Sequence, residues 1–516
     1  MAEYLHPGVY IEEIERGPKP IEGVPTSTAA FLGETERGTT EPTLVTSYKE
    51  YRRSFGGVIG DDKFMPYAVS GFFENGGKRL YVCRITDDQA TPAQAPFGQG
   101  FTVQAVGPGS WGRRVFVKIQ DSSTKKPNGA NNPPVAVGFR LRVAYYNAPP
   151  QGAPADWFND PLKPPYPAYA EDFDDLVLDE NSPNFFEKRL LDASALVTLI
   201  RTPGTPPTTQ PSREVKALTV NGVDGAPSLD DADFVGDTTT NRKSPQGLTA
   251  LTLDPYREVS LVYAPGASET IAKKLVIHCE NQKYRFAAVD SPRTMSSNYE
   301  PRNAVADSKY AALYYPWIVV SDPETGARKI VPPGGHTLGI YARTDNERGV
   351  FKAPANEIVR GALDLTADTD DGTQDVFNPK GINAIREFPG RGIRVWGART
   401  LTSDALWKYV SVRRLFIFLE RSIYEGTQWV VFEPNDDRLW ARVVDTIRLF
   451  LRTQWRGGAL FGRTEAEAFF ITCDRTTMTQ DDILNGRLIC EIGVAPVRPA
   501  EFVIFRIFQY TAEAQR

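Results

Sequence analysis

The apolar and polar positions of the chain form two kinds of pattern, one typical of buried strands and one typical of helices, and together they predict a mixed α/β fold. Two short runs, Thr28–Gly33 and Leu80–Ile85, are largely apolar, which is typical of strands buried on both faces. Ser47–Phe55 predicts a short helix between them, and Ser268–Asn281 predicts a longer one further along. Because strands and helices alternate in this way, we expect a mostly parallel sheet with helices packed against it.

The middle of the chain breaks this alternation. It holds most of the proline-rich stretches, and between them Arg114–Gln120 and Val137–Tyr146 have strand-like patterns. We therefore expect residues 89–246 to form an inserted β-rich domain. The flanking residues 26–88 and 247–345 are expected to share one discontinuous α/β core.

The last third of the chain has the clearest helical pattern. Residues 346–490 predict a second α/β domain, and within it Asp436–Arg456 predicts an amphipathic helix with Asn435 as its N-cap. Gly457-Gly458 is expected to end this helix. Its apolar face is formed by Trp440, Val443, Val444, Ile447 and Leu451.

Both ends of the chain carry apolar runs beyond proline-containing tethers. The first run lies ahead of Pro18 and Pro20, in an arm of residues 1–25, and the second lies in an arm of residues 491–516. An exposed edge strand invites pairing, so each arm is expected either to fold back or to pair with a neighbour. The side chains expected to make these contacts are Val9, Tyr10, Ile11, Ile14, Phe502, Val503, Ile504, Phe505, Ile507 and Phe508.

Composition excludes several classes of protein. The chain has 516 residues, 41% of them hydrophobic and 24% charged, which is typical of a multidomain globular protein. Its net charge of −5 gives no general case for nucleic-acid binding. No apolar run approaches the roughly 20 residues that span a bilayer. The four cysteines are scattered without a CxxC pair, so we expect mostly buried, reduced thiols.

Catalytic patterns are scarce. The chain has three histidines and contains neither HExxH nor GxxxxGK[ST], which argues against a zinc protease and a P-loop nucleotidase. The stretch GPGSWG has Pro108 where a GxSxG nucleophile motif needs glycine. Adjacent acidic residues lie in polar stretches, and neighbours in sequence do not face each other. We expect no enzymatic activity, no cofactor and no metal site.

One region has a positive net charge, although the chain as a whole is acidic. Residues 391–456 contain 12 Lys and Arg against 7 Asp and Glu. Five arginines lie on the helix predicted for Asp436–Arg456: Arg438, Arg442, Arg448, Arg452 and Arg456. They form either a solvated helix face or a docking surface for an acidic partner. Aromatic residues do not alternate with them, which argues against single-stranded nucleic acid.

Several blocks of sequence carry a resemblance to a known family. The N-terminal part contains HPGVYIEEIERGPKPIEGVPTSTAAFLGETERG and FFENGGKRLYVCRI, and the centre contains YAALYYPWIVVSDPETG and VPPGGHTLGIYARTDNERGVFKAPAN. The last third contains GINAIREFPGRGIRVWGARTL, KYVSVRRLFIFLERSI, FEPNDDRLW and IGVAPVRPAEFVIF. Together these blocks resemble the contractile tail sheath proteins of contractile-tailed phages and phage-tail-like injection particles. Residues 87–247 match that family only loosely.

The resemblance implies a structural protein whose terminal arms pair with strands of neighbouring copies. In this family stacked rings, commonly six-fold, surround an inner tube. The implied partners are other copies of the chain, the inner tube protein, and baseplate and terminal cap proteins. No nucleic acid and no direct membrane insertion is implied. The arginine-bearing helix would line the inside of the ring, and the particle would be assembled in the bacterial cytoplasm.

Two other functions fit parts of the pattern. An α/β enzyme with an inserted β domain would need polar residues converging at the carboxyl ends of the strands, and the sequence does not show them. A static shell or capsid protein would also explain the arms. It would not explain the blocks shared with sheath proteins.

Overall fold

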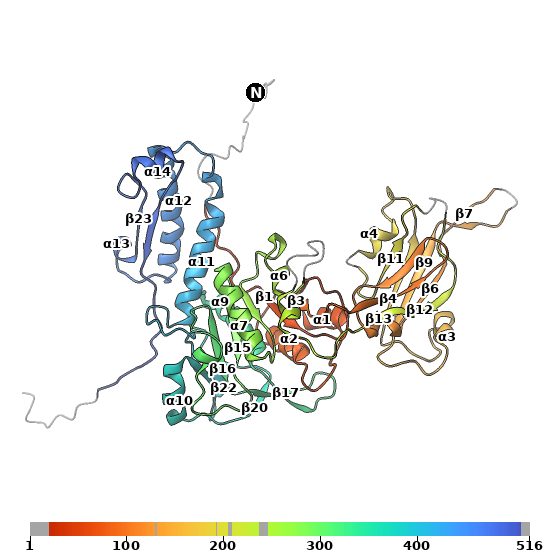
Figure 1. Cartoon of the computed structure of the whole chain (residues 1–516), viewed down its shortest axis with the longest axis horizontal. Helices are drawn as coiled ribbons and strands as arrows, with labels where there is room; N and C mark the ends of the chain where they lie inside the picture. Colours follow the sequence, from red (N-terminus) through yellow and green to blue (C-terminus); the bar gives the residue numbers. More distant parts are fainter. Residues whose placement is uncertain (1–19, 130–131, 192, 205–208, 237–245, 507–516) are drawn as a thin grey trace, which may run out of the picture. The chain divides into compact units, whose positions relative to one another are not determined.

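The computed structural model describes residues 20–129, 132–191, 193–204, 209–236 and 246–506 (Figure 1). The described chain falls into two compact units. We call residues 25–413 the sheet unit, and residues 20–24 with 414–506 the helical unit. Expected contact residues Val9, Tyr10, Ile11, Ile14, Ile507 and Phe508 lie outside the described residues.

A nine-stranded sheet forms the centre of the sheet unit. In spatial order its strands are β19 (Glu357–Ile358), β22 (Gly392–Val395), β21 (Ile382–Phe388), β16 (Ala311–Tyr315), β15 (Phe286–Asp290), β14 (Leu261–Tyr263), β1 (Ala29–Gly33), β3 (Leu80–Arg84) and β2 (Thr43–Val45). The six strands from β21 to β3 are parallel, and β2, β22 and β19 extend the sheet antiparallel at its two ends. All five residues of β1 and of β16 are buried, because both faces of a parallel sheet are covered.

Helices pack against this sheet. They are α1 (Tyr48–Phe55), α2 (Met65–Glu74), α7 (Glu269–Gln282), α9 (Gly334–Arg348) and α10 (Asp371–Phe377). Ser47 and Ser268 cap α1 and α7 by accepting backbone amides, as serine does at helix starts. Helices α2 and α9 pack closely, since a Cβ on Gly335 would meet the backbone of Ala68 at 2.5 Å.

The insert, residues 91–223, is a sandwich of two four-stranded antiparallel sheets (orange to yellow in Figure 1). One sheet orders β10 (Tyr169–Leu176), β9 (Phe139–Tyr145), β6 (Val115–Asp121) and β12 (Val215–Ala217). The other orders β11 (Val197–Arg201), β5 (Phe101–Ala105), β4 (Thr91–Pro96) and β13 (Val220–Val223). Alternate side chains of both sheets share one buried core that includes Trp111.

The helical unit places two long helices beside a small sheet. Helix α11 (Val410–Gly426) crosses the boundary between the units, and α12 (Asp437–Arg456), α13 (Glu465–Ala468) and α14 (Gln480–Leu484) follow it. Strands β23 (Phe469–Thr472) and β24 (Glu491–Val494) pair antiparallel. Residues 20–24 pack on α11, where the Val24 amide donates to Ser422 Oγ at 3.1 Å.

Three details differ from the sequence-based expectations. The chain divides near residue 413 and not near 346, because β19, β21 and β22 complete the central sheet. Residues 491–494 form β24, so the C-terminal arm begins after this strand. The N-cap of α12 is Asp436, whose carboxylate accepts the Arg438 and Leu439 amides, whereas Asn435 accepts a hydrogen bond from Trp440 Nε1.

Candidate assembly surfaces

Helix α12 has one buried face and one arginine-bearing face. Its buried side chains are Leu439, Trp440, Val443, Thr446, Ile447, Phe450 and Leu451. At about 100° per residue, the five arginines fall within an arc of about 120° on the opposite side. Arg438 and Arg456 are 18 residues apart, so they lie on the same line along the helix. The predicted amphipathic face is confirmed, except that Val444 is only partly buried.

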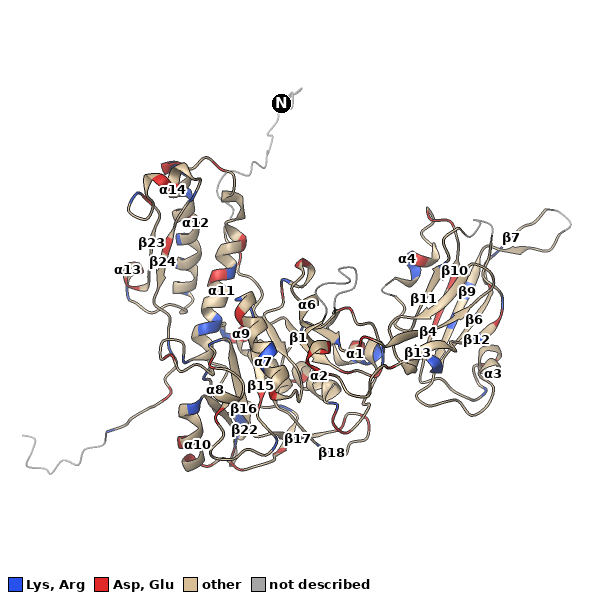
Figure 2. Cartoon of the chain, viewed as in Figure 1, with Lys and Arg blue, Asp and Glu red and all other residues tan. Residues whose placement is uncertain are grey.

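Acidic residues of the same unit pair with three of these arginines and so neutralise part of this surface. Figure 2 marks acidic and basic positions along the ribbon. Arg442 pairs with Glu433 at 2.9 Å, and Arg452 pairs with Glu465 at 2.8 Å. Arg448 lies 3.2 Å from Asp445 and 3.6 Å from Glu465. Among the described residues Arg438 and Arg456 are exposed and have no ion pair. The charge available to a partner is therefore concentrated on the line of these two side chains.

The β23–β24 sheet has open edges. It consists of two strands, and within the described chain no other named strand pairs with either of them. Leu460 and Pro496 form a single bridge beyond its end. Phe470 on β23 is 58% exposed. A two-stranded sheet is marginal by itself, and its unpaired backbone groups are a template for a further strand.

The described end of the chain is apolar and uncovered. Residues 501–506 form no helix or strand in the single chain. The large side chains here are 68–84% exposed: Phe502, Val503, Ile504 and Phe505. Such a concentration of exposed apolar side chains marks an interaction site in a monomer surface.

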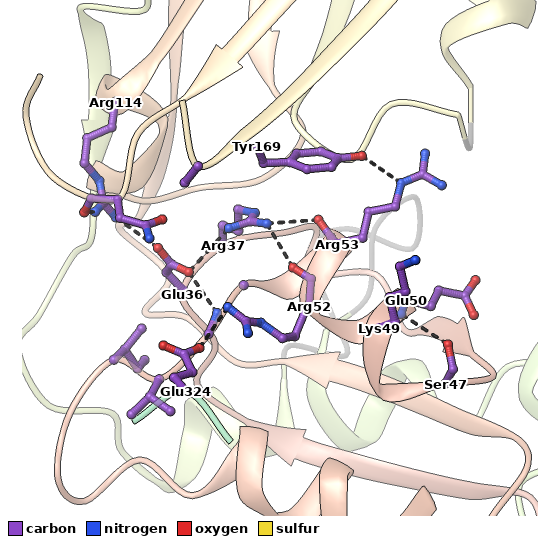
Figure 3. A pocket seen from close by; sticks show the side chains of 16 residues that line it. Glu36, Arg37, Ser47, Lys49, Glu50, Arg52, Arg53, Arg114, Tyr169 and Glu324 are labelled. Carbon is purple, nitrogen blue, oxygen red and sulfur yellow. Dashed lines mark hydrogen bonds and ion pairs between the residues drawn. The ribbon is translucent and has the colours of Figure 1, made fainter. Parts of the chain in front are cut away.

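Sequence reasoning missed a polar pocket where the insert meets the sheet core (Figure 3). Its walls come from α1, from the Glu36–Arg37 loop and from the insert residues Arg114 and Tyr169. Arg53 of α1 donates to the Tyr169 hydroxyl at 2.9 Å and to the Ala193 carbonyl at 2.6 Å. Both acceptors belong to the insert, so α1 holds the insert against the core.

Glu36 is the centre of this junction. Its carboxylate accepts the Tyr145 hydroxyl and the Gly57 amide, and it pairs with Arg37 at 3.3 Å and Arg114 at 3.6 Å. Arg37 also covers the Tyr145 ring at 4.7 Å. Charge-assisted bonds of this kind are stronger than neutral ones. The stretch GETERG gave no local signal of this role, because the insert partners of Glu36, Arg114 and Tyr145, lie more than 70 residues away in sequence.

The two histidines among the described residues, His278 and His336, lie in the core of the sheet unit. Burial, reinforced by the Arg285 guanidinium 2.7 Å away, lowers the pKa of His278 to about 3. Burial of the His336 side chain, which belongs to α9, lowers the pKa of its imidazole to about 4. Both rings are therefore neutral at physiological pH. Neither lies in the junction pocket.

The described residues contain neither a metal-binding cluster nor a helix that could span a membrane. No group of three or more His, Cys, Asp or Glu side chains in this part of the chain is arranged to hold a metal ion. No helix among the described residues is long and apolar enough to cross a membrane. The candidate assembly surfaces of the described chain are the open edges of the β23–β24 sheet, the apolar residues 502–505 and the arginine face of α12.

Comparison with known proteins identifies the family. A model of the phage tail sheath protein central domain matches residues 237–401, and a model of the phage tail sheath C-terminal domain matches residues 402–509. The chain belongs to the phage tail sheath protein family. The fold places the open β23–β24 sheet and α12 inside the segment matched by the C-terminal model.

Curated sheath proteins match over part of their length. A putative prophage major tail sheath protein of Pseudomonas aeruginosa (strain UCBPP-PA14) is 26% identical over 254 residues, which cover 48% of this chain and 64% of the relative. The tail sheath protein of Burkholderia phage BcepMu is 30% identical over 208 residues, or 39% of this chain and 42% of that protein. The aligned segments thus span less than two thirds of these relatives.

Solved sheath structures match the whole chain. The anti-feeding prophage helical sheath in its contracted state is 25% identical, with a TM-score of 0.58 and coverage of 98% of this chain and 99% of that chain. A chain of the 6-fold symmetrised anti-feeding prophage baseplate is 25% identical, with a TM-score of 0.56 and coverage of 98% and 100%. The contracted sheath of an extracellular contractile injection system, PVC, shares the fold at a TM-score of 0.58, with full coverage of both chains and 24% identity. The mixed α/β fold expected from the sequence is confirmed.

Proposed function

We propose that this sheath protein is the structural subunit of a contractile sheath around the inner tube of a phage-tail-like injection particle. One observation carries the proposal: the chain combines an unpaired two-stranded sheet with an exposed apolar terminal segment. Each is unfavourable in an isolated subunit, and each satisfies the other when copies polymerise. The likeness to contracted sheath structures supports the same conclusion.

Strand addition is the proposed contact between copies. Terminal segments from neighbours would add to the free edges of β23 and β24, where main-chain hydrogen bonds give affinity and alternate side chains give register. Phe502, Val503, Ile504 and Phe505 are the described residues assigned to this contact. Val9, Tyr10, Ile11, Ile14, Ile507 and Phe508 are assigned to it from the sequence alone.

Contraction would then be a rearrangement of rigid subunits joined by persistent strand pairs. The proline-containing tethers assigned from the sequence are Pro18–Pro25 and Pro496–Pro499. Residues 20–24 pack on α11 and Val497 bonds to Ala459, so the subunit bodies would turn at parts of the tethers beyond these contacts while the paired strands stay together. The energy for this movement would be stored in the extended assembly, so the subunit needs neither nucleotide nor catalytic residues.

The proposed partners follow from this arrangement. The subunit binds other copies of itself in stacked rings, and six-fold symmetry is supported by the similar chain in the 6-fold symmetrised baseplate. The inner tube protein, the baseplate and a terminal cap protein complete the assembly. We assign the arginine face of α12, with Arg438, Arg442, Arg448, Arg452 and Arg456, to contact with the tube. Assembly in the bacterial cytoplasm precedes release of the particle.

Removal of the arms tests the proposal. Deletion of residues 1–20, and separately of residues 501–516, is expected to leave a folded subunit that forms no long tubes. The matched control is Leu162→Asp, which places a charge on an exposed apolar side chain of the insert, 83% accessible and outside both arms. This variant is expected to polymerise normally. Negative-stain microscopy and sedimentation measure the outcome, and normal tubes from both truncated chains would refute strand exchange.

A further inference from the structure

Cys473 and Cys490 flank the β23–β24 sheet at the same end. Cys473 directly follows β23, and Cys490 directly precedes β24. The last paired residues of the two strands are Thr472 and Glu491. Continuing the antiparallel register by one residue places Cys473 directly opposite Cys490. Each thiol shifts the pKa of the other, as expected for side chains that lie next to each other.

The phase of the ladder brings their backbones close. The Ala495 amide donates to the Ala468 carbonyl, and hydrogen-bonded pairs recur at every second residue of an antiparallel ladder. Counting from this bond, Cys473 and Cys490 occupy a non-hydrogen-bonded position, where Cα atoms are about 4.5 Å apart. A disulfide spans Cα separations of about 4.4–6.8 Å. Both residues are free thiols in this structure.

The local structure holds the two cysteines close together and leaves only Cys490 partly accessible to solvent. Thr477 Oγ1 donates to the Ile489 carbonyl at 2.9 Å, which holds the connecting loop closed next to the two cysteines. Cys490 is partly exposed, whereas Cys473 is 7% exposed. Cys83 and Cys279, the other two cysteines, are completely buried in the sheet unit. A solvent-borne oxidant therefore meets Cys490 first and finds Cys473 beside it.

We propose that Cys473 and Cys490 form a disulfide when the protein meets a thiol oxidant such as a small disulfide. The Cys490 thiolate attacks one sulfur of the small disulfide, which forms a mixed disulfide and releases one small thiol. Cys473 then loses its proton and attacks the Cys490 sulfur, which displaces the second small thiol. Two protein thiols are oxidised by two electrons, and one small disulfide is reduced to two thiols.

The reaction is slow at neutral pH. Burial and the neighbouring Cys473 thiol raise the pKa of Cys490 to about 12, and burial together with the Asp474 carboxylate raises the pKa of Cys473. Because the thiolate is the attacking species, exchange proceeds only from the small fraction of Cys490 that is deprotonated. The pair thus stays reduced among cytosolic thiols and oxidises during long exposure outside a reducing compartment.

The bond would reinforce the sheet that we assign to strand exchange, although the chemistry itself does not depend on that assignment. It closes the loop of residues 474–489 and fixes the pairing register of β23 with β24. A closed loop of this length restricts the unfolded chain, which raises the melting temperature of the helical unit by about 5 °C or more.

Thiol counting on the full-length protein tests the proposal. The protein is held with excess oxidised glutathione for a day at pH 8, denatured without reductant, and treated with N-ethylmaleimide. We expect two labelled cysteines in place of four. Trypsin cuts after Arg475 and Arg487, which lie between the two cysteines, so the disulfide appears as a linked pair of peptides that dithiothreitol separates.

Two variants sharpen the result. Cys473→Ser is expected to retain glutathione on Cys490, because no second thiol displaces it. The control Cys83→Ser is expected to form the Cys473–Cys490 bond at the wild-type rate. Four labelled cysteines in the wild type, or a glutathione adduct that persists on wild-type Cys490, would overturn the proposal. An unchanged melting temperature on oxidation would overturn the stabilising role.

Discussion

At the scale of single residues, Asp290 joins three parts of the sheet unit. It ends β15, and its carboxylate accepts the Tyr263 hydroxyl at 2.7 Å and the amides of Gly266 and Gly334 at 3.1 Å. Gly334 is the first residue of α9. Burial nevertheless outweighs these three bonds and raises the pKa of Asp290 to about 6. The carboxyl therefore takes up a proton in the folded state more readily than in the unfolded chain.

The raised pKa predicts how stability depends on pH. The contribution of Asp290 is fully present below the unfolded pKa, near 4, and is lost as the pH rises through about 6. Relative to Asp290→Asn, which does not titrate, the free energy of unfolding of the wild type should fall by about 2 kcal/mol between pH 4.5 and 7.5. Urea unfolding at both pH values measures this difference.

Asp322 supplies the control for this prediction. Hydrogen bonds from Tyr67 and from the amides of Thr325 and Glu324 outweigh partial burial and lower the pKa of its carboxyl, so its contribution is lost only at pH values below the ordinary aspartate pKa. Asp322→Asn should therefore leave the difference in stability between pH 4.5 and 7.5 almost unchanged. Equal pH dependence in the wild type and in Asp290→Asn would show that the carboxyl titrates in the folded protein as it does in the unfolded chain.

Residue-level expectations succeeded where the signal was local. The sequence predicted Ser47 at the start of α1 and the apolar face of α12, since both depend on neighbours a few positions away. It placed the N-cap of α12 one residue early, because Asn435 and Asp436 are both good caps and the choice depends on Trp440 binding Asn435. Glu36 escaped notice because tertiary contacts alone give it a role.

At the scale of elements, α12 carries a charge pattern that the structure refines. Its arginines pointed to an acidic partner, but Glu433, Asp445 and Glu465 already engage Arg442, Arg448 and Arg452. Exposed pairs of this kind contribute about 0.2–1 kcal/mol each. Contacts of similar strength with a partner would suit the proposed tube surface, which would have to release that partner along the whole particle at once. Glu433 and Asp445 lie within the region whose charges were counted, but a count does not show which arginines they engage, and Glu465 lies outside that region.

Charge reversal on this helix tests the tube contact. Arg438→Glu with Arg456→Glu changes the two arginines that have no ion pair among the described residues, so the fold should persist. We expect contracted sheath without tube, and few extended particles. Arg442→Glu with Arg448→Glu and Arg452→Glu should give the same phenotype but also disturb the unit's own ion pairs. Counts of extended particles by microscopy measure the effect, and a wild-type ratio in the double variant would remove α12 from the tube contact.

One apolar run contributes strands to two different sheets, which the sequence pattern alone does not show. Residues 310–320 look continuous in sequence, yet they form β16 in the central sheet and β17 (Ile318–Ser321) in a separate three-stranded sheet. Pro316 interrupts the run, since proline has no amide to give to a ladder. The expected domain boundary near residue 346 was wrong for a similar reason: β21 pairs with β16 across a long connection that has no local signature.

At the scale of the whole molecule, the alternation of strand and helix was enough to predict a mostly parallel sheet. The return of the same pattern after the proline-rich middle also predicted which segments flank that middle. Sequence could not supply the spatial order of nine strands, because strand neighbours depend on crossovers between distant segments. Nor could it show that Tyr145, Arg114 and Tyr169 join the insert to the core through Glu36 and Arg53.

Proteolysis of intact particles tests where the insert lies in the assembly. We expect it on the outer surface, since it is rich in loops and matches sheath proteins only loosely. Proteinase K should therefore cut first near Pro149–Pro154, where the chain is exposed, or near Pro203–Pro211. The control is the isolated subunit, in which α12 should also become accessible. Preferential cutting of particles within residues 435–456 would place α12, and not the insert, on the outside.

The central claim is that copies of this chain build a sheath through strands donated to β23 and β24. A helical reconstruction of polymers from the purified full-length protein, by electron cryomicroscopy, tests it most directly. We predict hollow tubes of stacked rings in which segments of neighbouring copies, Phe502–Phe505 among them, pair with the free edges of the β23–β24 sheet. Monodisperse monomers, closed shells, or tubes in which these edges stay unpaired would contradict the account.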